Sequence, residues 1–213
     1  MKRHRESGFS MIEIAIVLSI VLVVSALATP SIISSVAAVK MTSTAQAFAS
    51  LLQDARMKSA RDNKTYGVSC VQTDNTNPAA IDGCKILFID TDGSGTLNTS
   101  GNLSKMELDI QVASAVKFTT TPPGTTVDSA LSYSPNPTAA SVTPVGMAYF
   151  NARGLACQFE GGKCVNITSA NKQTGFLYYM TSRDVLGNTH YAAVSVSPSG
   201  RIKVWKFDGT IWS

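Results

Sequence analysis

One carboxylate stands alone in a long apolar stretch near the start of the chain. Between Glu6 and Lys40 the only ionisable side chain is Glu13. A charged group costs about 2.5–3.5 kcal/mol at the centre of a bilayer and less near a helix end, and it usually has a functional partner. Cleavage after Gly8 would create an α-ammonium group on Phe9, close to Glu13 in the sequence. We therefore expect the Phe9 ammonium of one molecule to pair with Glu13 of its neighbour; the alternative is an interfacial glutamate that reaches water on its own.

The segment that carries Glu13 is predicted to be a membrane-spanning helix. Residues 9–28 are nearly all Ile, Val, Leu, Ala or Met. With a rise of about 1.5 Å per residue, such a helix covers roughly 30 Å, the thickness of a hydrocarbon core. Lys2, Arg3 and Arg5 precede it, and the positive-inside bias leaves that end in the cytoplasm. We therefore interpret residues 9–30 as an anchor behind which the rest of the chain is exported.

The start of this segment resembles a known processing signal. A short basic leader, residues 1–8, is followed by Gly8-Phe9-Ser10-Met11-Ile12-Glu13 and an unbroken apolar helix. This arrangement resembles the N-terminus of type IV pilins and type II secretion pseudopilins, where the pattern is usually G-F-[ST]-L-[ILV]-E. Met11 occupies the place of the usual leucine. The resemblance implies cleavage between Gly8 and Phe9 by a prepilin peptidase, N-methylation of Phe9 and subunit docking through Glu13.

The same resemblance implies where the chain resides and what it contacts. A single-pass protein of the bacterial inner membrane with a periplasmic head is expected first, surrounded by membrane lipid. An inner-membrane assembly platform would then move it into a periplasmic or extracellular helical filament of other pilins or pseudopilins. The alternative is an ordinary secretory signal peptide, because Ala26-Leu27-Ala28 is an A-x-A-like site and cleavage there would leave Thr29 first. Glu13 within the apolar core and helical patterning beyond Ala28 argue against that alternative.

Beyond Pro30 the helix is expected to continue as an amphipathic second half over residues 31–64, ending near Asp62-Asn63. Its apolar stripe recurs at helical spacing, at Ala45, Phe48, Leu51, Leu52, Ala55 and Ser59. The side chains mostly off this stripe are polar or charged, namely Lys40, Gln46, Gln53, Asp54, Arg56 and Lys58. The stripe predicts a helix packed on a sheet.

The remainder, residues 65–213, is predicted to be a β-rich head, which makes the fold α+β: a long N-terminal helix packed on an antiparallel sheet. Short strands are expected at 66–72, 85–90, 105–111, 116–120, 146–150, 175–182, 190–196 and 201–207. Residues 121–144 are rich in Pro, Thr, Ser and Ala and are expected to be a surface excursion. Phe176-Leu177-Tyr178-Tyr179-Met180 is almost entirely apolar or aromatic and indicates a strand covered on both faces.

Only 15% of the residues are charged, and Ser, Thr, Asn and Gly are plentiful, which suits an extracytoplasmic head. The formal net charge is +4, of which the leader contributes +2, so the processed chain would carry +2 and does not by itself indicate a nucleic-acid partner. The four cysteines are Cys70, Cys84, Cys157 and Cys164. An even number in an exported domain favours two disulfides. A hairpin turn at Glu160-Gly161 would bring Cys157 opposite Cys164, which leaves Cys70 for Cys84; zinc is disfavoured because neither pair has C-x-x-C spacing.

Two further constellations can be given a binding function. Asp90-Thr91-Asp92-Gly93-Ser94-Gly95-Thr96-Leu97-Asn98 resembles the start of an EF-hand loop, but its twelfth place is Gly101 instead of Glu, so a polar hairpin turn is favoured over calcium. At the other end of the chain, Arg201, Lys203 and Trp205 alternate along a predicted strand and therefore share a face. They could hold a phosphate backbone with a stacked base, whereas a solvated strand face with Trp205 covering an edge is the favoured alternative.

The C-terminal segment adds a second resemblance. The pilin-type start, a strand followed by Asp-Thr-Asp-Gly, and Ser197-Pro198-Ser199-Gly200-Arg201-Ile202-Lys203 together resemble the GspH/FimT family of minor pseudopilins and minor pilins. Some members bind DNA for natural transformation through a terminal G-R-x-R motif, and here the last place is Lys203, which keeps the charge but loses the planar fork. DNA is therefore a possible partner. No nucleophile, phosphate-loop or H-E-x-x-H motif indicates an enzyme, and no cofactor is expected.

Overall fold

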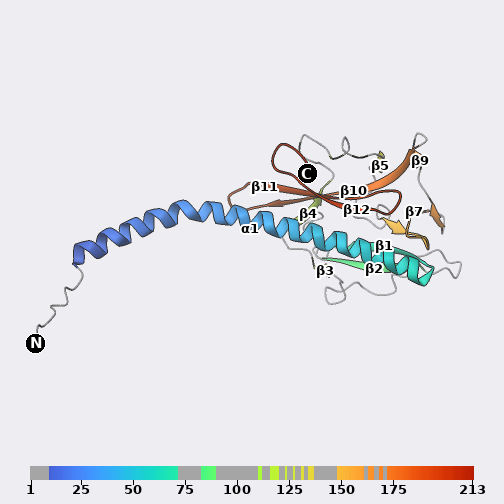
Figure 1. Ribbon diagram of the computed structural model, residues 1–213, viewed down its shortest axis with the longest axis horizontal. Helices are drawn as coiled ribbons and strands as arrows, with labels where there is room; N and C mark the ends of the chain where they lie inside the picture. Colours follow the sequence, from blue (N-terminus) through green and yellow to red (C-terminus); the bar gives the residue numbers. More distant parts are fainter. Residues whose placement is uncertain are drawn as a thin grey trace, which may run out of the picture.

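The computed structural model describes residues 10–71, 83–89, 110–111, 116–119, 134–136, 148–160, 163–165, 168–169 and 172–213, together with Pro123, Val127 and Leu131. Figure 1 shows a long helix, α1 (Met11–Asp62), whose first half projects away from a β-rich head. This arrangement confirms the predicted α+β fold with an N-terminal helix packed on antiparallel sheets. The helix runs through Pro30 without a break, as expected.

The helix ends where the sequence predicts. Asn63 adopts a left-handed conformation with φ 53°, and its N–H bonds to the carbonyl oxygen of Ser59. The N–H of Lys64 bonds to the same oxygen at 3.2 Å. A left-handed residue at this position satisfies the last carbonyl groups of a helix and turns the chain away from its axis. The chain then enters the first strand directly.

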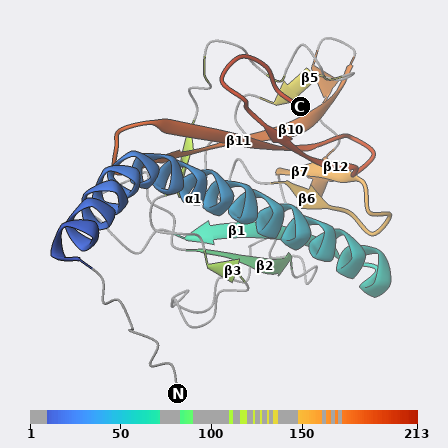
Figure 2. The same ribbon diagram turned by 60° about the vertical axis from the view of Figure 1, so that its left-hand side comes forward.

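The head contains two groups of strands. The first follows the order β3 (Ile110–Gln111), β2 (Gly83–Ile89), β1 (Thr65–Val71), β6 (Tyr149–Phe150), β7 (Ala156–Glu160) and β8 (Lys163–Val165). The second follows the order β12 (Ile202–Lys206), β11 (Thr189–Val196), β10 (Lys172–Arg183) and β4 (Val116–Thr119). Two short strands, β5 (Ser134–Asn136) and β9 (Thr168–Ser169), add to β10. The second half of α1 lies between the two groups (Figure 2).

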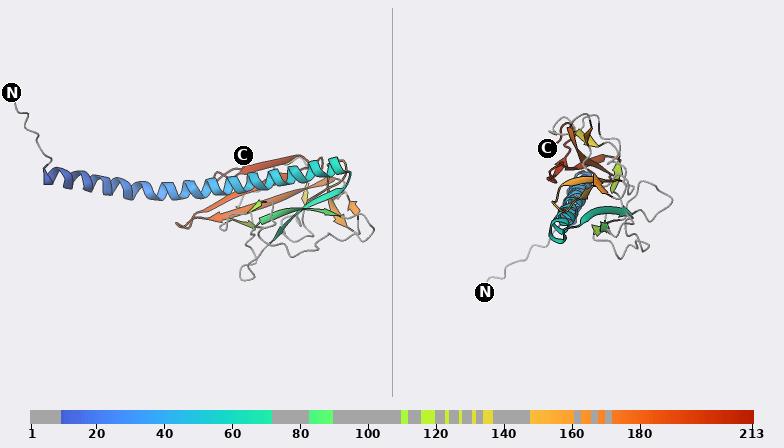
Figure 3. Two further views of the ribbon diagram at one scale, coloured as in Figure 1. Left: turned by 90° about the horizontal axis from the view of Figure 1, so that it is seen from below. Right: turned by 90° about the vertical axis from the view of Figure 1, so that its right-hand side faces the viewer.

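The helix stripe forms the centre of the main core. All six predicted stripe residues are buried, including Phe48, Leu52 and Ala55. The Phe48 ring packs edge-on against Phe118 of β4 and Tyr178 of β10, with ring centroids 5.3 Å apart in both pairs. Fully burying one such apolar side chain contributes about 1.5–3 kcal/mol, so this contact fixes the helix on the head. The end-on view in Figure 3 shows the helix enclosed by strands on more than one side.

A smaller core covers the opposite face of β10. It contains Leu177 and Tyr179 of β10, Ala193 of β11 and Trp205 of β12, with Val127 buried over them. The Tyr179 hydroxyl accepts a hydrogen bond from the Val127 N–H at 3.0 Å. Every residue from Phe176 to Met180 is buried, which confirms the prediction of a strand covered on both faces.

Most predicted strands are present, with shifted ends, and a few predictions are wrong. The strands β1, β2, β4, β10, β11 and β12 correspond to predicted strands, whereas only Ile110–Gln111 and Tyr149–Phe150 are described as strand within the predicted 105–111 and 146–150. Residues 134–136, expected to be irregular, form β5, which pairs parallel to β10. The hairpin register also differs from the prediction, because Glu160 pairs with Lys163 and Phe159 pairs with Cys164.

The cysteines occupy neighbouring positions in paired strands. A disulfide joins Cys157 of β7 and Cys164 of β8, whose Cα atoms lie 5.5 Å apart, as a diagonal link across the hairpin instead of the directly opposite pair that was expected. In the β1–β2 ladder the backbone of Cys70 lies directly opposite that of Cys84. This register is compatible with the second expected disulfide, between Cys70 and Cys84. That disulfide stays a prediction, because the structure describes the backbone of these two residues but not their side chains.

Candidate functional site: the exposed helix and the C-terminal turn

The first half of α1 is not covered by any part of the head that the structure describes. Its apolar side chains are exposed along the whole length, for example Ile12 at 68%, Leu22 at 70% and Leu27 at 76%. A soluble monomer rarely exposes a continuous apolar surface of this size, so the surface indicates a membrane or a protein partner. The helix is long and apolar enough to cross a membrane by length and composition.

Glu13 lies in the first turn of this helix. Ser10 is the N-cap, and the Glu13 N–H bonds to the Ser10 carbonyl oxygen at 3.0 Å. The spacing of Ser10 and Glu13 is that of a capping box, although the Ser10 side chain makes no capping hydrogen bond. A carboxylate in a first turn is favoured by the helix dipole, which gives Glu13 a local structural role.

The surroundings of Glu13 leave its carboxylate free for an outside partner. Glu13 borders a shallow surface hollow of about 290 Å³ lined by Ile14, Val17 and Leu18. Within the part of the chain that the structure describes, its side chain makes no hydrogen bond or ion pair. Gly8 and Phe9 lie outside the described residues, so cleavage, methylation and the pairing of Phe9 with Glu13 stay predictions.

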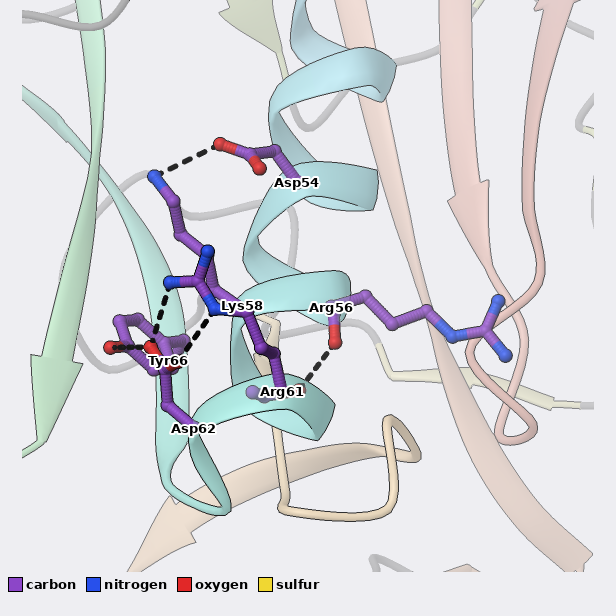
Figure 4. Close-up of polar contacts among 7 residues, drawn as sticks. Asp54, Arg56, Lys58, Arg61, Asp62 and Tyr66 are labelled. Carbon is purple, nitrogen blue, oxygen red and sulfur yellow. Dashed lines mark hydrogen bonds and ion pairs between the residues drawn. The ribbon is translucent and has the colours of Figure 1, made fainter.

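The helix ends in a polar group on one side and a single arginine on the other (Figure 4). Asp62 accepts hydrogen bonds from the Arg61 Nε at 2.7 Å and the Tyr66 hydroxyl at 2.7 Å. These hydrogen bonds lower the pKa of the Asp62 carboxyl group to about 2. Lys58 pairs with Asp54 at 3.0 Å one turn earlier. Arg56 extends away from this group toward the hairpin of β11 and β12.

The C-terminal motif begins in the turn between β11 and β12. The Ser197 N–H donates to the Arg201 carbonyl oxygen at 2.8 Å, and the Gly200 N–H donates to the Ser197 carbonyl oxygen at 2.8 Å. The Arg201 N–H donates to the Ser197 hydroxyl at 2.9 Å. This network shapes the turn and leaves the side chains of Arg201 and Lys203 exposed.

Trp205 does not provide the stacking surface that its spacing predicts. The indole is only 7% exposed and belongs to the smaller core. Its Nε1–H donates to the Ser195 hydroxyl at 2.8 Å, and the Lys203 Nζ lies 3.3 Å from the ring centroid. The cation–π contact and the core therefore occupy the ring, and a nucleic-acid base has no free face of Trp205 on which to stack. The burial agrees with the favoured alternative, in which Trp205 covers part of the fold, and a DNA-binding role for Trp205 stays a prediction.

The hairpin tip between β10 and β11 is organised by Asp184, which the sequence did not indicate. The Asp184 Oδ1 accepts hydrogen bonds from the N–H groups of Leu186 at 2.9 Å and Asn188 at 2.8 Å, while the Asn188 amide donates to Oδ2 at 3.0 Å. Burial raises the pKa of the Asp184 carboxyl group, but these hydrogen bonds and the nearby His190 side chain outweigh it, so the net pKa is lowered. His190 Nε2 lies 3.5 Å from Oδ2, so His190 supports this tip.

A cluster of three arginines is a second feature that sequence reasoning missed. Arg56 of α1, Arg153 of the β6–β7 turn and Arg201 of the β11–β12 turn line one pocket of about 380 Å³. They are far apart in the sequence, and no local pattern links them. Only Arg201 was singled out for binding. In contrast, the described residues hold no group of three His, Cys, Asp or Glu side chains that could bind a metal ion, and the EF-hand-like loop 90–98 lies outside them.

Comparison with known proteins identifies the N-terminal segment. Residues 3–29 match the family described as the prokaryotic N-terminal methylation motif. No curated protein and no solved structure matches the chain. The matched residues include the basic leader and the exposed apolar part of α1. The match supports a type IV pilin-like subunit of a pilus or pseudopilus, and it is consistent with anchoring in the inner membrane through that helix.

Proposed function

We propose that the chain is a minor pilin or pseudopilin of the GspH/FimT kind, a structural subunit of a type II secretion pseudopilus or type IV pilus. The observation that carries this proposal is the division of one continuous helix into two environments. Residues 11–29 are exposed and apolar, whereas the stripe from Ala45 to Ser59 is the core of the head. Together with the methylation motif at residues 3–29, this division fits a subunit that inserts one half of its helix among lipids or sister helices.

The exposed half can exchange one apolar environment for another at little cost. Helices in a membrane associate through packing and polar contacts, because lipid tails are as apolar as the side chains they replace. A filament formed from such helices offers the same kind of surroundings. Glu13 then provides the directional contact, because its carboxylate lies in the first helical turn, close in sequence to the amino group that cleavage after Gly8 would create.

The docking role is tested by Glu13→Gln, which keeps the size of the side chain and removes its charge. The variant is expected to be processed normally, while the fraction that co-purifies with sheared filaments or partner subunits falls about tenfold, the loss expected for one partly buried charge pair. Ser25→Ala in the same exposed half is the matched control and is expected to assemble as the wild type does. Normal assembly of Glu13→Gln would contradict the docking role.

DNA binding through Gly200-Arg201-Ile202-Lys203 is the alternative function. The exposure of Arg201 and Lys203 favours it, whereas the burial of Trp205 leaves no indole beside them on which a base could stack. Binding of an oligonucleotide that weakens with salt and disappears in the double variant Arg201→Gln plus Lys203→Gln would support this alternative.

A further inference from the structure

Three arginines from distant parts of the chain meet at one surface pocket. Arg56 comes from the penultimate turns of α1, Arg153 from the turn between β6 and β7, and Arg201 from the turn between β11 and β12. The remaining lining residues are Gln53, Met57, Ala60, Gly154 and Ile202. The lining therefore combines three cationic side chains with the apolar side chains of Met57, Ala60 and Ile202.

Arg56 holds the two turns in place. Its Nε donates to the Gly154 carbonyl oxygen at 3.0 Å, and its Nη2 lies 3.5 Å from the Ser199 carbonyl oxygen. Gly154 and Gly200 both have positive φ, 70° and 79°. A Cβ atom at Gly200 would overlap the Gly154 carbonyl oxygen, so the two turns approach closely only because this residue is glycine. The pocket is thus built on a fixed backbone.

The charge of the pocket is not balanced by the residues that the structure describes. None of the ion pairs among them involves Arg56, Arg153 or Arg201, and both Arg153 and Arg201 are exposed. Three like charges around one pocket repel one another, and an anion bound between them would offset that repulsion. Guanidinium groups present a planar fork that matches carboxylate and phosphate oxygens.

The apolar residues that line the pocket favour the carboxylate of an acidic side chain over a nucleic-acid backbone. Met57, 63% exposed, lies beside Ala60 and Ile202 and offers an apolar surface for the methylene groups of an acidic side chain. A nucleic-acid strand is usually held by a groove that tracks its backbone and by aromatic side chains on which bases stack. The nearby Trp205 is buried, and the three arginines converge on one pocket instead of following a line.

The position of the pocket indicates which molecule would supply that side chain. Gln53, Met57 and Ala60 belong to an exposed stripe of α1 that alternates steps of four and three residues: Val39, Ser43, Gln46, Ser50, Gln53, Met57 and Ala60. Residues spaced in this way share one face of the helix, and this face is largely polar and exposed. It connects the exposed apolar half of α1 with the arginine pocket, so a neighbour packed along α1 would reach the pocket.

We propose that the pocket of Arg56, Arg153 and Arg201 binds an acidic side chain of a neighbouring filament subunit. This inference rests on the proposed function and names the chemistry of the partner at a second contact, distant from Glu13. Arg56 shapes the pocket, while Arg153 and Arg201 supply free guanidinium groups to the incoming carboxylate.

The test measures binding to the dispersed full chain in detergent micelles, so that it needs neither processing nor a filament. The probe is the peptide acetyl-Leu-Glu-Leu-amide, compared with acetyl-Leu-Gln-Leu-amide, and the readout is the shift of the arginine Nε–Hε signals in NMR spectra. The glutamate peptide is expected to shift these signals and the glutamine peptide is not. Arg153→Gln and Arg201→Gln are each expected to weaken binding about tenfold, the loss of one charge-assisted hydrogen bond.

Lys206→Gln is the matched control, because it removes one positive charge from β12, the strand that follows Arg201, but from outside the pocket. It is expected to bind as the wild type does. Equal binding of the two peptides, or wild-type affinity in both arginine variants, would overturn the proposal. Displacement of the peptide by a single-stranded oligonucleotide that binds more tightly to the same arginines would also overturn it and assign the pocket to nucleic acid. Failure of N-terminal processing would refute the proposed function while leaving this result unchanged.

Discussion

Gly200 shows how one residue of a recognisable motif can serve structure before it serves binding. Its φ of 79° is in the left-handed region, and it lies against the Gly154 carbonyl oxygen and the Arg56 Nε. The motif Gly200-Arg201-Ile202-Lys203 therefore needs glycine for the close approach of two turns. The sequence indicated the position, but not this reason for it.

Replacing Gly200 with alanine is expected to lower the free energy of unfolding by at least about 2 kcal/mol, because a strained φ and a backbone overlap add together. Gly209→Ala is the matched control: it also has positive φ, but nothing lies within 4 Å of its added Cβ atom. That control is expected to cost only about 1 kcal/mol. Urea unfolding of the full chain in micelles, followed by tryptophan fluorescence, measures both. Equal costs would show that the overlap with Gly154 is absent.

Asp184 is expected to make the β10–β11 tip sensitive to acid. Despite its burial, its pKa is lowered in the folded protein by hydrogen bonds from Asn188 and Leu186 and by the nearby His190. A lowered pKa means that its stabilising effect is complete above the ordinary value of about 4 and is lost as pH falls through the lower, folded value. Amide exchange at Leu186 and Asn188, corrected for intrinsic rates, should therefore accelerate below about pH 4.

Asp184→Asn is expected to abolish that acid dependence, while Asp208→Asn should leave it intact. Asp208 also has a lowered pKa, because it accepts hydrogen bonds from the Ile211 and Thr210 N–H groups, but it lies in a different turn. An unchanged acid dependence in Asp184→Asn would assign the transition to another group.

At the scale of the element, α1 is one continuous helix whose two halves lie in different environments. Its second half buries a stripe that packs on both groups of strands, while its first half exposes apolar side chains. Apolar composition predicted the first half, and helical periodicity predicted the second half, because both signals are local in sequence. The left-handed Asn63 then terminates the helix.

Leu52→Ala is expected to destabilise the head by about 2–5 kcal/mol, because Leu52 is fully buried and the substitution leaves a cavity at the helix–sheet contact. Met57→Ala, on the exposed side of the same helix, should change the free energy of unfolding by no more than about 0.5 kcal/mol. Urea unfolding of both variants tests the assignment of faces. A similar, small effect of both substitutions would mean that the helix stripe is not the core.

The strands show where sequence reasoning reaches its limit. Alternation and turn residues located β10, β11 and β12, but they did not reveal which face of β12 is covered. Trp205 is buried because Val127 and Leu131, from the stretch expected to be irregular, take part in the smaller core. The arginine pocket was missed for the same reason, since its three guanidinium groups come from three segments that only the fold brings together.

At the scale of the whole molecule, the proposed function requires a subunit that leaves the membrane with α1 and the β-rich head unchanged. The exposed half of α1 projects beyond the strands in Figure 1 and in the left view of Figure 3, so it can be surrounded by lipid or by sister helices without rearranging the head. The methylation motif covers this half, and the head carries its own cores. In the proposed function, processing of the N-terminus would convert the anchored precursor into an assembly subunit.

Intact-mass spectrometry and N-terminal sequencing of the protein isolated from its native membrane test this central claim most directly. We expect a chain that begins with N-methylated Phe9 and lacks residues 1–8, and we expect the uncut chain in cells without prepilin peptidase. A native chain that begins at Met1, or one that begins at Thr29 after removal of the whole exposed helix, would contradict the account.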